Sequence, residues 1–213
     1  MPEPPRVAHL DELPAIAGDV TWRPVRHELG VGAFGVNAYS AVAAGDLLIE
    51  DHDEASGGAG RHEELYLVVR GHARFTVDGR EVDAPAGTLV FVPDAASRRV
   101  AVAVEPDTIA IVVGGRRGEA YVPSPWEGSA LAAAFAQRGE HERALALAAA
   151  ALDDHPDSGS VLYNVACAES LSGAREAAIE HLRRALELEP RAAEWARDDT
   201  DLDPLRDDPA FPA

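Results

Sequence analysis

Hydrophobic and polar residues alternate through much of the first half of the chain. The clearest stretch is residues 62–93, HEELYLVVRGHARFTVDGREVDAPAGTLVFVP. A period of two sustained over more than four residues is the pattern of a half-buried strand. Asp78-Gly79 lies between two such runs, and this dipeptide favours a type I′ hairpin because both central residues take positive φ. Short, regularly spaced strands of this kind predict an antiparallel barrel or sandwich.

Similar runs flank this stretch on both sides. They cover residues 21–39, 47–49, 100–104 and 109–113, and turn residues separate them. We therefore predict a mainly β domain over residues 19–115. Residues 1–18 are acidic and rich in proline, and we expect them to form either a mobile arm or a strap that packs on the β-domain.

From Trp126 onward the spacing of apolar residues becomes helical, and alanine dominates. Two segments repeat with an offset of 34 residues. The offset aligns Gly139 with Gly173, Ala144 with Ala178, Ala151 with Ala185 and Pro156 with Pro190. Small residues let two helices approach closely, glycine turns the chain between them, and proline stops the second helix. We predict an all-α domain over residues 126–213, joined to the β-domain by a linker at 116–125.

Charge and cysteine content narrow the range of functions. The formal net charge is −18, with 11 arginines against 19 acidic residues up to residue 123 and 8 against 18 beyond it. Neither part carries the basic surface that nucleic acid requires. Cys167 is the only cysteine, so no intramolecular disulfide can form. No secretory signal and no apolar run of membrane-spanning length is evident, and we expect a soluble cytoplasmic protein.

Two spacings in the β-region, each involving a glycine, resemble the sequence motifs of the cupin family. Glu64, six residues and Gly71 reproduce the end of the first cupin motif, and Gly87, five residues and Pro93 match the second. The resemblance covers roughly residues 18–115. It implies a cupin-type antiparallel β-barrel or jelly roll, and, because many cupins pair through barrel edges, it also implies a homodimer.

The residues that hold a metal ion in metal-binding cupins are mostly changed. The paired histidines of the first motif fall here within Gly57-Gly58-Ala59-Gly60, which offers no donor. The histidine of the second motif aligns with Arg98, a permanent cation without a lone pair. Of the usual four ligands, only Glu64 remains in place. The resemblance therefore implies a β-domain without its family's cation cage.

The sequence offers substitute donors upstream of Glu64. If the glycine loop is an insertion, His52 and Glu54 could replace the paired histidines, whereas counting forward from Gly45 gives Asp51 and Asp53 instead. A register shift of one residue exchanges the two faces of a strand, so both alternatives stay open.

His62 shares strand parity with Glu64, so both side chains should point into the barrel. Histidine and carboxylate ligands suit zinc, iron or manganese. The competing interpretation of His62 is a barrel-lining histidine that hydrogen-bonds Glu64 or Tyr66. We expect a ligand pocket lined by His62, Glu64, Tyr66, Phe91 and Arg98. Arg98 could pair with Glu64 or hold an anionic group of a ligand.

The 34-residue offset of the helical part resembles tetratricopeptide repeats. The resemblance implies a surface that binds another protein. Two repeats are fewer than the three that usually bury a continuous core, so the remaining residues should form a cap. We expect Trp195, Leu202, Leu205 and Phe211 to cover the exposed end.

Three functions fit these observations. The first is a small-molecule-binding or sensory cupin with little or no catalysis and no expected cofactor, coupled to a helical-repeat module that binds a protein partner. The second is a metal-dependent cupin enzyme of dioxygenase or isomerase type that uses His52, Glu54, His62 and Glu64. The third is a metal-free acid–base enzyme in which Glu64, tuned by His62 or Arg98, moves a proton.

Overall fold

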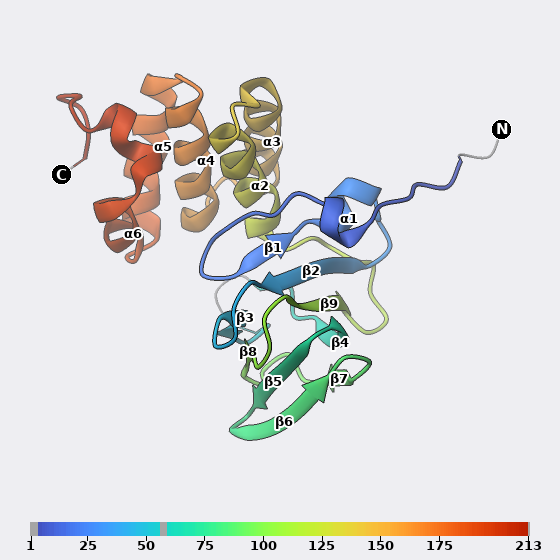
Figure 1. Cartoon of the computed structure of the whole chain (residues 1–213). Helices are drawn as coiled ribbons and strands as arrows, with labels where there is room; N and C mark the ends of the chain where they lie inside the picture. Colours follow the sequence, from blue (N-terminus) through green and yellow to red (C-terminus); the bar gives the residue numbers. More distant parts are fainter. Residues whose placement is uncertain (1–3, 56–58, 213) are drawn as a thin grey trace. The chain divides into compact units, whose positions relative to one another are not determined.

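Two antiparallel β-sheets form the N-terminal part of the chain, and helices form the C-terminal part (Figure 1). The computed structural model describes residues 4–55 and 59–212. The chain divides into two compact units, Met1–Pro123 and Ser124–Ala213. Residues 1–3 of the predicted arm, and Gly57 and Gly58 of the glycine loop, lie outside the described residues.

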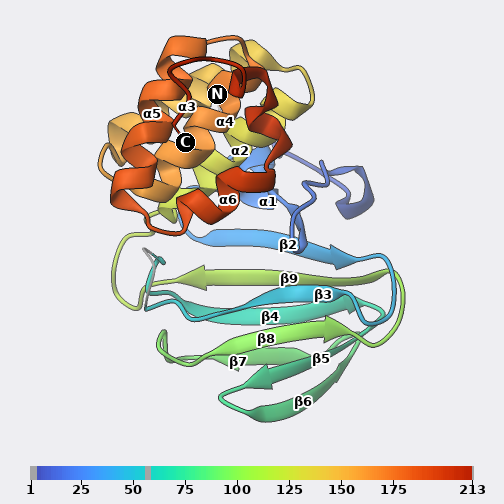
Figure 2. The same cartoon turned by 90° about the vertical axis from the view of Figure 1, so that its left-hand side faces the viewer.

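The first sheet has the strand order β1-β2-β9-β4-β7 and the second has the order β3-β8-β5-β6 (Figure 2). The strands of the first sheet are β1 (Thr21–Arg23), β2 (Gly35–Ala41), β9 (Thr108–Gly115), β4 (Glu63–Arg70) and β7 (Leu89–Val92). Those of the second sheet are β3 (Leu47–His52), β8 (Arg99–Ala103), β5 (His72–Val77) and β6 (Arg80–Pro85). The strand pairs in both sheets are antiparallel.

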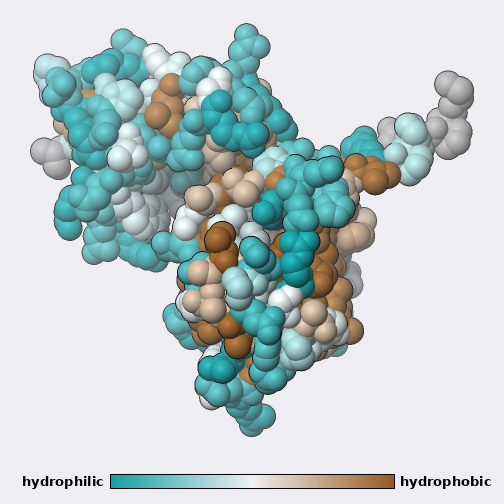
Figure 3. All heavy atoms as spheres, in the orientation of Figure 1, coloured by the Kyte–Doolittle hydropathy of each residue, from teal (hydrophilic) through white to brown (hydrophobic). Residues whose placement is uncertain are grey.

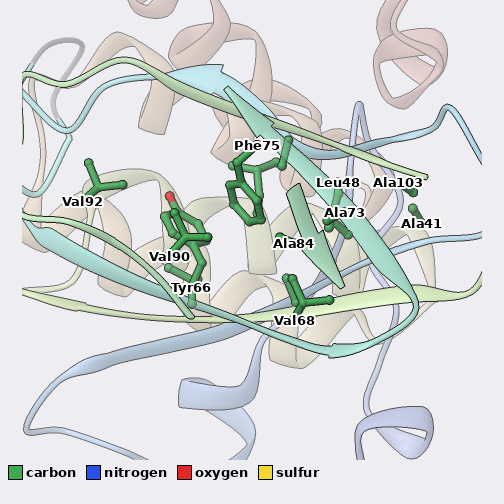
Figure 4. Close-up of a cluster of buried hydrophobic side chains, with 14 residues drawn as sticks. Ala41, Leu48, Tyr66, Val68, Ala73, Phe75, Ala84, Val90, Val92 and Ala103 are labelled. Carbon is green, nitrogen blue, oxygen red and sulfur yellow. The ribbon is translucent and has the colours of Figure 1, made fainter. Parts of the chain in front are cut away.

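Side chains from both sheets share one hydrophobic core (Figure 4). Tyr66 and Val68 reach it from β4, and Phe75 reaches it from β5, with its ring centroid 5.3 Å from that of Tyr66. The alternation in the sequence explains this arrangement, since every second residue of a strand faces the core. The predicted hairpin is confirmed, because Asp78 (φ 48°) and Gly79 (φ 78°) join β5 to β6 with the two positive φ angles that a type I′ turn needs.

A short helix, α1 (Val25–Leu29), replaces part of a predicted strand. Pro24 precedes it, and Gly30 ends it in the left-handed conformation (φ 65°), where its N–H bonds the Arg26 and His27 carbonyls. Before α1, the chain forms one 3₁₀ turn, η1 (Leu10–Glu12), and residues 4–9 ahead of this turn are exposed. Leu13 is buried against Val25.

The C-terminal unit repeats a helical pair. Its helices are α2 (Pro125–Gln137), α3 (His141–Asp154), α4 (Gly159–Leu171), α5 (Arg175–Leu188) and α6 (Ala192–Asp198), followed by the 3₁₀ helix η2 (Thr200–Leu205). Helix α4 begins 34 residues after α2, at 159 against 125, and α5 begins 34 after α3, at 175 against 141. Gly139 (φ 78°) and Gly173 (φ 80°) turn the chain within the two pairs.

The end of the chain packs on the second helical pair. Leu202 and Leu205 of η2 are buried in a cluster with residues of α4 and α5, and Trp195 and Phe211 pack against that cluster. These are the residues that the sequence predicts for a cap. Within the described ranges, no helix is both long and apolar enough to cross a membrane.

Candidate functional site

Three donor side chains meet where β3 and β4 approach each other from different sheets. His52 ends β3, Glu54 follows it by two residues, and Glu64 lies near the start of β4. Both carboxylates are buried, at 9% exposed each, while the His52 side chain is 32% exposed. The cluster therefore lies at the edge of the core with one member in contact with solvent.

The distances within this cluster fit ligation better than hydrogen bonding. His52 Nε2 lies 3.9 Å from Glu54 Oε1 and 3.7 Å from Glu64 Oε2, which is too long for a hydrogen bond. One donor atom from each residue lies within 4.8 Å of the other two. Two atoms that share a zinc, iron or manganese ion lie about 3–4 Å apart, since each bond is about 2.0–2.2 Å long. The three side chains can thus converge on a small cation.

Glu54 is held in place by the backbone that follows it. Its Oε2 accepts hydrogen bonds from the N–H groups of Gly60 (3.0 Å) and His62 (3.5 Å). Its own carbonyl accepts from the Arg61 N–H (2.9 Å). These bonds fix one carboxylate oxygen and leave Oε1 directed at His52.

The fourth predicted donor, His62, does not join the cluster. Its Nδ1 lies 3.6 Å from Glu54 Oε2, the oxygen already used by backbone groups, and its Nε2 is buried without a hydrogen-bond partner in the described part of the chain. The His62 ring packs against the Tyr121 ring, with centroids 5.3 Å apart. A Cβ on Gly60 would come within 2.1 Å of the His62 ring, so a larger residue there would displace this ring. His62 therefore supports Glu54, and the predicted set of four donors is reduced to three.

Tyr66 and Arg99 approach the same oxygen of Glu64. The Tyr66 hydroxyl donates a hydrogen bond to Glu64 Oε2, and Arg99 Nε lies 3.4 Å from it. Arg99 is fully buried. It enters the site because β8 pairs with β3 in a register that places Arg99 opposite His52.

The buried groups shift one another's proton affinities. Burial raises the pKa of Glu54 above its ordinary 4.5, and the charge of Glu64 raises it further. Burial also raises the pKa of Glu64. The nearby His52, the Tyr66 hydroxyl and the Arg99 guanidinium together outweigh this effect and hold that pKa below 4.5. Burial lowers the pKa of His52, but its contact with Glu64 prevails and the pKa lies above 6.5. The surroundings of Glu64 thus favour its ionised form, whereas those of Glu54 favour its protonated form.

The prediction that Arg98 lines the ligand pocket is wrong, and its neighbour Arg99 lies inside instead. The Arg98 side chain is 62% exposed and its Nε lies 2.7 Å from Asp51 Oδ1 on the outside of the sheet. Alternation along β8 sends Arg99 inward instead, on the same face as the buried Ala101. The positions of the side chains decide the open choice upstream, because His52 belongs to the donor cluster whereas Asp51 is 55% exposed.

Of the other predicted pocket residues, Tyr66 points into the core at 1% exposed, and Phe91 does not. Phe91 is 53% exposed on β7. It lines a groove of about 340 Å³ together with Phe34, Leu65 and Tyr121. The prediction that Phe91 lines the interior pocket is therefore wrong. The run Leu89–Val92 is apolar at every position, so the sequence cannot indicate which residues face inward.

Sequence reasoning missed Arg99 and Tyr121. Arg99 shares strand parity with Ala101 and Ala103, which are buried in the shared core, but alanine and valine are both apolar and the sequence alone does not mark that face as the inner one. Tyr121 lacks even this parity. It lies 59 positions beyond His62 in a segment without periodicity, and only the folded chain brings the two rings together.

Comparisons with known proteins find likeness in structure. No family model matches the sequence, and no curated protein does. KdgF from Halomonas sp. is 19% identical with a TM-score of 0.40, over 50% of this chain and 88% of that one. A sugar phosphate isomerase of the cupin superfamily from Silicibacter pomeroyi is 17% identical with a TM-score of 0.42, over 52% and 76%. A cupin protein from Bacteroides fragilis is 16% identical with a TM-score of 0.37, over 49% and 84%.

Proposed function

We propose that the N-terminal unit is a cupin-type domain that binds a divalent metal ion through His52, Glu54 and Glu64 and uses it to act on a small molecule. The observation that carries the proposal is the pair of distances from His52 Nε2 to the two carboxylate oxygens, 3.9 and 3.7 Å. One imidazole and two carboxylates are ligands that zinc, iron and manganese accept. An ion in this place would supply Lewis acidity to a bound oxygen atom.

The residues around the donors support such a site. The Tyr66 hydroxyl bonds Glu64, and the Gly60 N–H bonds Glu54, so each carboxylate has a partner that fixes its orientation. Partners of this kind commonly change metal affinity by about 10- to 100-fold when they are removed. The His52 side chain is partly exposed, so one side of the site is open to solvent. An ion that acts on a small molecule needs an open coordination position of this kind.

Metal content of untagged protein purified without chelators tests this proposal. We expect close to one zinc, iron or manganese ion per chain, and loss of that ion in His52→Ala and Glu64→Gln. His72→Ala is the matched control, because His72 contacts a carboxylate, Asp83 at 2.6 Å, outside the cluster. Protein that takes up no ion, even when zinc or manganese is added to the metal-free form, would contradict the proposal.

A second candidate is a metal-free binding pocket in which Arg99 takes the place of the cation. The 3.4 Å approach of the Arg99 guanidinium to Glu64 favours it, since that pair neutralises one of the two buried carboxylates. One variant distinguishes the two candidate functions. Arg99→Met should tighten metal binding if an ion shares the site with the arginine, and should destabilise the fold without any gain in metal binding if the arginine replaces the ion.

We further propose that the helical unit consists of tetratricopeptide-like repeats that bind a protein partner. The 34-residue offset of both helices and of the turn glycines supports this. The face of this unit seen in Figure 3 is largely hydrophilic, and the sequence beyond residue 123 carries 18 acidic residues against 8 arginines. A basic peptide should therefore bind the full chain with an affinity that falls as salt is added. Equal binding of a peptide with the opposite charges would contradict this.

The N-terminal unit is also proposed to form a homodimer through β7. This strand lies at the edge of the first sheet and exposes Leu89 (62%) and Phe91 (53%). Apolar surface is visible on this unit in the space-filling view (Figure 3). An exposed apolar edge strand is a common place for two chains to pair.

A further inference from the structure

Arg99 is a fully buried cation whose hydrogen-bonding capacity is unused. Its Nε, Nη1 and Nη2 atoms make no hydrogen bond to any described residue. A guanidinium carries five N–H donors, and burying them without acceptors is costly. The strand pairing fixes the side chain at the donor cluster, since Arg99 lies opposite His52 on one side and opposite Val77 on the other.

The nearby carboxylate cannot satisfy Arg99 on its own. Glu64 Oε2 is the oxygen that Arg99 approaches at 3.4 Å, and the same atom accepts the Tyr66 hydroxyl and lies nearest to His52. An ion bound at Glu64 Oε2 would occupy another of its lone pairs. The guanidinium therefore needs an acceptor that the protein does not supply.

The charges at the site point to the nature of that acceptor. Glu54 and Glu64 carry two negative charges, whereas a divalent ion and Arg99 carry three positive charges, and His52 binds an ion as a neutral ligand. One monoanion restores neutrality. A carboxylate has one charge and two coplanar oxygens that match the fork of a guanidinium. Phosphate, with a charge of about −1.5 to −2 near neutral pH, exceeds what the site needs.

We propose that Arg99 binds the carboxylate of a small carboxylic-acid ligand held at the His52–Glu54–Glu64 ion, an inference that rests on the metal-binding function proposed above. The ligand enters beside His52, whose side chain is 32% exposed, and its carboxylate reaches Arg99 at the buried side of the cluster. Arg99 thus selects ligands by charge and planarity, and the ion binds a second oxygen of the same molecule.

Calorimetric titration of acetate into the full-length, zinc-loaded protein tests this inference, with phosphate as the contrasting anion. Arg99→Met should lower acetate affinity by roughly tenfold to a hundredfold, because it removes charge-assisted hydrogen bonds. The same variant should bind zinc at least as tightly as the wild type, because a like charge is gone. Arg98→Met is the matched control, since this neighbouring arginine pairs with Asp51 on the outside and should change neither affinity.

Circular dichroism shows whether Arg99→Met folds. If it does not fold, Arg99→Lys is used for the same titration. Lysine keeps the charge but not the planar fork, so acetate affinity should fall several-fold. Acetate binding equal to that of the wild type in either folded variant, or phosphate binding tighter than acetate, would overturn the inference while leaving the metal site standing. Failure of the wild type to bind zinc, measured separately, would overturn both proposals.

Discussion

His52 Nε2 and Glu64 Oε2 lie 3.7 Å apart, although the two residues belong to different sheets. His52 ends β3 in the second sheet, and Glu64 lies on β4 in the first. A ligand held between them therefore connects the two layers of the N-terminal unit at one edge of their shared core.

Metal binding should stabilise the protein against heat. A ligand that binds only the folded state adds stability by mass action, about 2.7 kcal/mol when its free concentration is 100 times the dissociation constant. Differential scanning calorimetry with and without zinc should show a higher unfolding temperature with the ion. Glu64→Gln should lose this increase and His72→Ala should keep it. An equal increase in both variants would place the ion elsewhere.

Replacing Gly60 by alanine should weaken metal binding. A Cβ at this position would meet the His62 ring at 2.1 Å, and the same residue's N–H holds Glu54 Oε2. Displacing either group moves Glu54 away from the ion, so we expect about a tenfold loss of metal affinity or more. Gly32→Ala is the control, because a Cβ there meets nothing within 4 Å. Unchanged affinity in Gly60→Ala, measured by metal titration, would show that the loop does not position Glu54.

Phe75 should contribute strongly to the stability of the β-unit. Its side chain is fully buried and packs on Tyr66. Phe75→Ala should cost about 3–5 kcal/mol in the free energy of unfolding. Phe34→Ala should cost within about 0.5 kcal/mol, since Phe34 is 45% exposed. Urea denaturation of both variants checks the difference, and similar losses would contradict the assignment of the core.

The stability of the helical unit should depend on pH through His181. Its hydrogen bond with Glu169 (2.7 Å) raises the pKa of His181 above 6.5 in the folded state. The folded protein thus holds this proton more tightly than the unfolded chain. The resulting stabilisation is fully present below about pH 6.5 and is lost as pH rises through the folded-state pKa.

Urea unfolding on both sides of that transition measures the effect. His181→Ala should remove this part of the pH dependence, whereas His155→Ala, which leaves the Glu169–His181 pair intact, should retain it. If both variants kept the pH dependence of the wild type, the Glu169–His181 pair would have no role in stability.

Formation of a homodimer should depend on Phe91. Phe91→Asp places a charge on the exposed edge strand β7 and should shift a dimer to monomer in analytical ultracentrifugation. Asp51→Asn, a surface change away from β7, is the control. A dimer that persists in Phe91→Asp would exclude this edge as the interface.

Regular elements with strong periodicity could be predicted from the sequence, and the site could be predicted only in part. The alternation around Glu64 and Tyr66 predicts their inward direction, and Asp78-Gly79 predicts its hairpin, because both depend on local geometry. The 34-residue offset likewise predicts two similar helical pairs. In the first two cases the chemistry of a few neighbouring residues determines the structure, and in the third the repetition of one local pattern does.

The predictions for Arg98 and Phe91 are wrong because the neighbouring residues are chemically alike, and the strand predicted around Val25 is wrong because the helix there is short. Arg98 and Arg99 have the same side chain, so only the strand register, set by the pairing of β8 with β3 and β5, decides which one is buried. Phe91 lies in a strand that is apolar on both faces. Helix α1 is five residues long, too short to show a helical period, and its boundaries depend on Pro24 and Gly30.

Anomalous X-ray diffraction from crystals of the full chain grown with zinc or manganese tests the central claim most directly. We predict one anomalous peak bonded to His52 Nε2 and to one carboxylate oxygen each of Glu54 and Glu64, at about 2.0–2.2 Å. The central claim would be contradicted by a structure in which Arg99 alone neutralises these carboxylates and the anomalous peak lies elsewhere on the protein.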